Sequence, residues 1–167
     1  MTNREIAAIL FNISTILTTQ AGNPYRIRAY RQAARNLLRL RYSVADRVAA
    51  GQPLGLPGLG KSLTSKISTL AQKDALEFYE ALCDELPADE RNLLKLRVQG
   101  LGPTIAARIH RDLGATDPAS LRRAAATGQL QKVWGLGPKR VAAIIDAIGG
   151  SSVRQESFEF YSIEQKS

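Results

Sequence analysis

The 167-residue chain has one cysteine, Cys83, and one histidine, His110. A single cysteine excludes an internal disulfide, and a zinc site usually needs several cysteine and histidine ligands. Cys83 stands among apolar helix positions, where a cysteine is typically a small buried residue. The sequence therefore argues against both a disulfide scaffold and a zinc protein.

The chain also lacks a long apolar run. The uncharged stretch 6–25 is interrupted by polar side chains, among them Asn12, Ser14, Thr15, Thr18, Thr19 and Gln20. A membrane-spanning helix needs about 20 predominantly apolar residues, and Arg4-Glu5 is an unsuitable start for a signal peptide. We therefore expect no membrane contact and a cytoplasmic, nucleoid-associated location.

Acidic residues are scarce in two regions of the chain. Residues 1–50 carry eight arginines against Glu5 and Asp46, and residues 101–150 carry seven basic side chains against three acidic ones. The formal net charge of the whole chain is +8. Two basic regions favour a polyanionic partner, although an inert cationic surface explains the charge equally well on its own.

No segment before residue 149 has the alternating pattern of a β-strand, whereas apolar residues recur at helical spacing throughout. The expected helices span residues 3–20, 24–39, 44–50, 61–72, 75–85, 88–95, 103–113, 118–127 and 138–148, with Asp74 and Glu77 capping the fifth. We predict an all-α fold with a first helical unit at 1–86 and a second at 87–149. The tail, 150–167, has a different composition, which fits a linker, a strand packed back on the protein or a partner-binding segment.

The phrase Gly-Leu-Gly occurs three times, at residues 58–60, 100–102 and 135–137. Each copy directly precedes a predicted helix. Glycine permits a tight turn and a close approach of the backbone to another surface. The N-terminus of a helix presents free N–H groups and the positive end of its dipole, which suits a phosphate. Three such turns on a basic chain predict a nucleic-acid backbone as the ligand.

The helix predicted after Asn23-Pro24 carries a row of arginines. At 100° per residue, the four fall within about 80° of one another around the helix, and they are Arg28, Arg31, Arg35 and Arg39. Like charges at this spacing destabilise a helix, and solvated helix faces usually mix acids with bases. We interpret the row as a phosphate-binding stripe, with an ordinary solvated face as the alternative.

Residues 55–62, Gly-Leu-Pro-Gly-Leu-Gly-Lys-Ser, match the P-loop pattern for nucleotide phosphates. That pattern functions only at the end of a buried parallel strand. Here an amphipathic helix and Gln52-Pro53 precede it, and proline is unsuited to the end of a central strand. This context argues against a nucleotide hydrolase.

Four segments together match a known family in order and spacing, from about residue 3 to 148. They are 23–34 (Asn-Pro-Tyr-Arg-Ile-Arg-Ala-Tyr-Arg-Gln-Ala-Ala), 56–60 with Lys66-Ile67, 98–103 and 135–139. The chain resembles the N-terminal, non-polymerising part of family X DNA polymerases. It is most similar to the bacterial members and more distantly resembles DNA polymerase beta.

The resemblance implies a lyase-type domain followed by a tandem helix-hairpin-helix domain that holds DNA. It also implies that hairpin N–H groups contact phosphates without reading bases. Hairpin carbonyls near Leu56, Leu59, Val98 and Leu101 would hold a monovalent cation, Na⁺ or K⁺, and no other cofactor is expected. The expected DNA-binding residues are Arg26, Arg28, Arg31, Arg35, Arg39, Gly58, Gly60, Lys61, Ser62, Gly100, Gly102, Thr104, Gly135, Gly137, Lys139 and Arg140.

The chain departs from the family in two respects. The polymerase palm with its metal-binding carboxylates is absent, so no polymerase activity is expected. The lyase site is only partly represented: Lys66 stands at the position of the family's Schiff-base lysine and Tyr30 at a tyrosine of the same pocket. Two further pocket lysines are replaced, one by Ser62 beside Lys61 and one by Arg26.

Three functions remain as hypotheses. The first is sequence-independent binding to the backbone of gapped, nicked or duplex DNA, in DNA repair. The second is a 5′-deoxyribose-phosphate or abasic-site lyase that acts through Lys66. The third is a scaffold that recruits a polymerase or nuclease through the tail.

Overall fold

The computed structural model describes residues 1–98, 100–115 and 117–148, so the predicted tail lies outside the described residues. The described part is helical and contains no strand, as the sequence predicts. None of its helices is long and apolar enough to cross a membrane. The helices are α1 (Asn3–Thr19), α2 (Pro24–Arg39), α3 (Val44–Ala49), α4 (Lys61–Lys73), α5 (Glu77–Asp84), α6 (Ala88–Leu94), α7 (Pro103–Leu113) and α8 (Pro118–Ala126), then the 3₁₀ turn η1 (Leu130–Lys132) and a last helix over 138–148.

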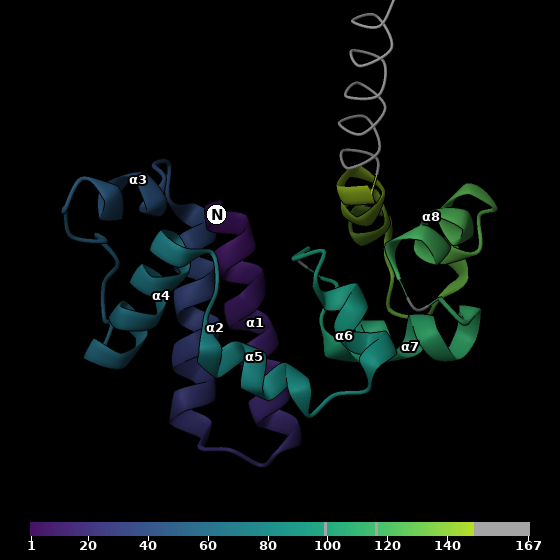
Figure 1. Ribbon diagram of the computed structural model, residues 1–167, viewed down its shortest axis with the longest axis horizontal. Helices are drawn as coiled ribbons and strands as arrows, with labels where there is room; N and C mark the ends of the chain where they lie inside the picture. Colours follow the sequence, from purple (N-terminus) through teal and green to yellow (C-terminus); the bar gives the residue numbers. More distant parts are fainter. Residues whose placement is uncertain (99, 116, 149–167) are drawn as a thin grey trace, which may run out of the picture.

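The first core forms around α1 and α2, which lie side by side (Figure 1). The two helices join at a tight turn where the Asn23 side chain accepts a hydrogen bond from the Tyr25 N–H and Pro24 takes the first helical position. Helix α1 also contacts α4, α5 and α7. Because neighbours cover it on several sides, α1 is buried over most of its circumference, from Ile6 to Leu17.

The second core lies within α6, α7, α8, η1 and the last helix, on the other side of the molecule in Figure 1. Its fully buried side chains include Leu93, Ile109, Leu121, Leu130 and Ile144. Cys83 and Leu86, at the end of α5 and just after it, pack against both cores. Cys83 is half-buried rather than buried, and this burial raises the pKa of its thiol.

Asp74 ends α4 instead of capping α5, which is a correction to the prediction from the sequence. It adopts the left-handed conformation (φ 55°), which aspartate tolerates better than most residues. Its carboxylate lies 2.9 Å from the α-amino group of Met1, and the hydrogen bond from that amine lowers the pKa of the carboxyl. Helix α5 therefore begins at Glu77, with Leu76 at its N-cap and no side-chain cap.

Arg97 connects the loop before the second glycine turn to the first unit. Its Nη2 donates to the Asp74 carbonyl at 2.9 Å, and its Nη1 lies 3.8 Å from a Glu5 carboxylate oxygen. Arg97 also has a left-handed backbone, with φ 51°. The guanidinium thus fixes the loop against both α1 and the end of α4.

A buried polar contact joins α1 to α5. The Asn12 Nδ2 donates to the Tyr79 hydroxyl at 3.0 Å, and the Asn12 residue is only 4% exposed. Burial strongly raises the pKa of Tyr79, so the phenol stays protonated across the physiological range. A buried polar group that loses its partner retains the full cost of its desolvation.

Replacing Tyr79 by Phe should therefore lower the free energy of unfolding by about 1–3 kcal/mol, because the Asn12 amide is left without its acceptor. Urea denaturation followed by circular dichroism measures this change. The matched control is Tyr25→Phe, since Tyr25 is 77% exposed and should shift stability by less than about 0.5 kcal/mol. Equal stability of Tyr79→Phe and the unaltered protein would show that the contact contributes nothing.

Candidate nucleic-acid interface

The second and third glycine turns have the same local geometry. The Leu101 N–H donates to the Val98 carbonyl at 3.0 Å, and the Leu136 N–H donates to the Val133 carbonyl at 3.2 Å. The glycines at the third position have φ values of 89° at Gly100 and 88° at Gly135. These values are typical of a type II turn, which requires positive φ at this position. Gly58 in the first copy is also left-handed, with φ 70°.

Each turn leads directly into a helix. The carbonyls of Gly60, Gly102 and Gly137 accept helical hydrogen bonds from the N–H groups of Thr64, Ala106 and Val141, at 3.0, 2.9 and 3.1 Å. Gly60 and Gly102 occupy the N-caps of α4 and α7 and provide no side-chain cap. The free N–H groups at these helix starts, from Lys61 in α4 and from Thr104 after Pro103 in α7, have no side-chain cap and suit an anion.

An arginine from each of the two later helices crosses the glycine of the other turn. Arg108 of α7 donates to the Trp134 carbonyl at 3.3 Å, and its Nη1 would lie 2.5 Å from a Cβ at Gly135. Arg140 lies across Gly100, with its Cγ 2.9 Å from the position of a Cβ there, and donates to the Gly135 carbonyl at 3.1 Å. The two turns are thus fastened to each other through their arginines.

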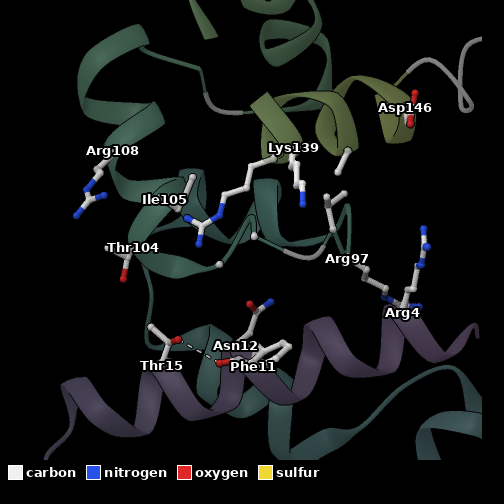
Figure 2. Close-up of a pocket in the computed structure, with 15 residues that line it drawn as sticks. Arg4, Phe11, Asn12, Thr15, Arg97, Thr104, Ile105, Arg108, Lys139 and Asp146 are labelled. Atoms are coloured by element: carbon white, nitrogen blue, oxygen red, sulfur yellow. Dashed lines mark hydrogen bonds between the residues drawn. The ribbon is translucent and has the colours of Figure 1, made fainter. Parts of the chain in front are cut away.

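These turns border a groove of about 730 Å³. In Figure 2, α1 forms one wall and carries Phe11 and Asn12, while Lys139 extends from the last helix on the opposite side. The predicted residues Gly100, Gly102, Thr104, Lys139 and Arg140 line it together. Its charged side chains are five cations and one carboxylate, namely Arg4, Arg97, Arg108, Lys139, Arg140 and Asp146. Such a groove attracts an anionic ligand.

Three of these cations were not predicted from the sequence: Arg4, Arg97 and Arg108. Arg97 lies in the second unit, directly before the second glycine turn. Arg4 reaches the groove only because α1 packs beside that unit, and no local pattern indicates this arrangement. Arg108 had a detectable signal, because it lies on the helix that directly follows the second glycine turn.

In the first unit, several residues predicted for DNA binding or for the lyase site lie close together. The Lys66 Nζ donates to the Ser62 hydroxyl at 2.6 Å and lies 4.9 Å from the centre of the Phe78 ring. The Arg26 guanidinium lies 5.1 Å from the same ring and 5.9 Å from the ring of buried Tyr30. Both are cation–π distances. Phe78 comes from α5 and was not predicted, because nothing in the sequence places α5 beside α4 and α2.

The P-loop pattern lies in a different context from that of a nucleotide hydrolase. Helix α3 and an irregular segment precede residues 55–62, and no strand lies before them. Lys61 and Ser62 begin α4 and are exposed. The segment is a turn that joins the packed helices α3 and α4, so it lacks the strand that a P-loop requires.

The predicted arginine row lies on the face of α2 opposite to its buried residues. Arg28 lies 5.7 Å from the centre of the Tyr25 ring, and Arg31 donates to the Thr18 hydroxyl at 3.3 Å. Arg35 and Arg39 are exposed. Within the described residues, no carboxylate forms an ion pair with any of the four. Their role in binding stays a prediction, as does the cation site near Leu56, Leu59, Val98 and Leu101.

Both parts of the chain have helix-hairpin-helix character. Residues 1–76 match a family model described as "Helix-hairpin-helix domain", and residues 91–149 match one described as "SAM-like Helix-hairpin-helix tandem". The chain is also similar to "DNA polymerase/3'-5' exonuclease PolX" of Bacillus subtilis (strain 168), with 28% identity over 158 residues.

That match covers 95% of this chain and 27% of the relative. The similarity lies in the N-terminal part of the relative, a family X polymerase, in agreement with the resemblance found in the sequence. The chain thus spans about a quarter of the relative's length. The hairpin domains and this similarity support DNA binding in a polymerase-related context.

Gly135→Ala tests the turn geometry. Alanine would have to adopt the left-handed backbone of this turn, which is unfavourable for an L-residue, and its methyl group would collide with Arg108. The free energy of unfolding should therefore fall by at least about 1–2 kcal/mol. The control is Gly137→Ala in the same turn, where a Cβ meets nothing within 4 Å and no positive φ is required. Denaturant midpoints measure both, and equal midpoints would contradict the assigned geometry.

Proposed function

We propose that this protein binds the DNA backbone independently of base sequence and acts in DNA repair. The observation that carries the proposal is the groove in which the second turn, its open helix N-terminus and the start of the last helix face five cations and one carboxylate. A phosphate chain satisfies both the uncapped N–H groups and the excess positive charge.

The kind of contact that the groove offers supports backbone binding over base reading. Backbone N–H groups and cationic side chains hold phosphates without carrying sequence information. Some of the groove's polar side chains stand at helix starts, such as Thr104 and Lys139. The arginine row on α2 supplies further cations that form no ion pair within the described residues. Gapped, nicked and duplex DNA all offer the phosphate chain that these groups suit.

Lys139→Gln and, in a separate variant, Arg35→Gln should each weaken binding to unrelated duplex sequences alike. Removal of one cation that neutralises a phosphate should reduce the steepness of the log–log dependence of affinity on salt by roughly 0.9. Fluorescence anisotropy across a salt series measures both effects. The control, Arg122→Gln, removes an exposed arginine of α8 outside the predicted contacts and should leave the slope unchanged. An affinity that does not depend on salt would refute backbone binding.

The first unit favours a second candidate function, a 5′-deoxyribose-phosphate or abasic-site lyase. Lys66 is half-buried, with its amine held by Ser62 and flanked by Phe78. In this proposal the amine adds to the C1′ aldehyde of the opened sugar and water leaves, which forms an imine. Loss of a C2′ proton to solvent and departure of the 3′ phosphate then break the C3′–O bond, and water hydrolyses the imine.

Borohydride reduction tests this chemistry, because it converts the imine into a stable covalent adduct. On incised abasic DNA, the unaltered protein should form an adduct that migrates with the protein, and Lys66→Ala should lose it. Lys73→Ala is the matched control, since Lys73 is exposed at the far end of the same helix. Absence of an adduct under conditions in which the DNA is bound would exclude the lyase and leave DNA binding intact.

A further inference from the structure

The third turn carries an exposed aromatic ring. Trp134 is 75% exposed, although the residues on either side of the turn, Val133 and Leu136, are buried in the second core. Those two side chains anchor the turn and leave Trp134 directed to solvent. A tryptophan ring normally buries a large apolar surface, so its exposure beside a phosphate-binding turn indicates a ligand.

Arg108 holds one side of this ring. Its guanidinium carbon lies 4.3 Å from the centre of the Trp134 ring, and its Nη1 donates to the Trp134 carbonyl. The Arg108 guanidinium thus stacks on the Trp134 ring and is held in place by its hydrogen bond to the Trp134 carbonyl. Because Trp134 remains 75% exposed, the other face of the indole is open. The pair is a preorganised surface with one free π-face.

The pair of Trp134 and Arg108 lies at one end of the groove. Arg108 lines the groove and extends outward at one end of it (Figure 2). Trp134 directly precedes Gly135, whose carbonyl is bound by Arg140 of the same groove. A strand whose phosphates follow the groove therefore passes close to the indole.

We propose that Trp134, backed by Arg108, stacks on an unpaired nucleobase next to the phosphates held in the groove. This inference rests on the proposed backbone binding and adds a preference for DNA that carries unpaired nucleotides beside a duplex. A base pair inside a duplex is already stacked on both faces, whereas an unpaired base can turn a free face to the indole. Stacking of this kind tolerates every base, so it is compatible with sequence-independent binding.

The test uses the fluorescence of Trp134, the single tryptophan of the chain. Three DNAs are titrated: a blunt duplex, the same duplex with a short single-stranded thymine extension, and that duplex with abasic nucleotides in the extension. We expect all three to bind and only the thymine extension to quench the emission strongly. Equal quenching by all three DNAs would overturn the proposal.

Trp134→Ala should lose about tenfold in affinity for the thymine extension, a loss typical of one stacked base, and should bind the blunt duplex as before. Trp134→Phe should retain part of the preference. Tyr25→Ala, which removes the other strongly exposed aromatic ring among residues 1–98, 100–115 and 117–148, should keep the full preference.

The outcomes separate the two proposals. An equal loss by Trp134→Ala on all three DNAs would overturn the stacking role, as would equal affinity of the unaltered protein for the three DNAs. Backbone binding survives the second of these results. Failure of the unaltered protein to bind any DNA would overturn both proposals. A Trp134→Ala protein that binds all three DNAs as tightly as the unaltered protein would show that the ring takes no part in DNA binding.

Discussion

The second half of the protein depends on one backbone constraint, the left-handed conformation at Gly100 and Gly135. This conformation reverses the chain within four residues and aims a helix N-terminus at the groove. The missing Cβ atoms also leave space for Arg140 and Arg108 to cross the turns. A side chain at either glycine would strain the turn and displace the arginine that fastens the two turns together.

Helix α1 connects the two units because it forms the centre of the first core and also one wall of the groove. Its buried residues form the centre of the first unit, while Phe11 and Asn12 form one wall of the groove. Asn12 also binds Tyr79 and lies against Gly102, since its Oδ1 would be 3.0 Å from a Cβ at that glycine. Packing and binding geometry are therefore coupled through a single helix.

The local features of this chain were predictable from the sequence, and the contacts between distant segments were not. Helical spacing indicated the helices to within a few residues, and Gly-Leu-Gly identified the turns. Asp74 was misassigned because its carboxylate pairs with the distant α-amino group of Met1. Phe78 and Arg97 were missed for the same reason: their partners lie far away in the chain. Trp134 was not singled out, since sequence alone does not show which face of a turn meets solvent.

The uncapped starts of α4 and α7 have a thermodynamic consequence. Thr2, Asn23, Ser43 and Asp117 cap other helices with their side chains, but Gly60 and Gly102 provide no such oxygen. We therefore expect the folded state to bind small oxyanions better than the unfolded chain does. By mass action, dissolved sulfate or phosphate should then raise the melting temperature of the DNA-free protein. The same anions should compete with DNA, so a buffer that stabilises this protein should also weaken its binding to DNA.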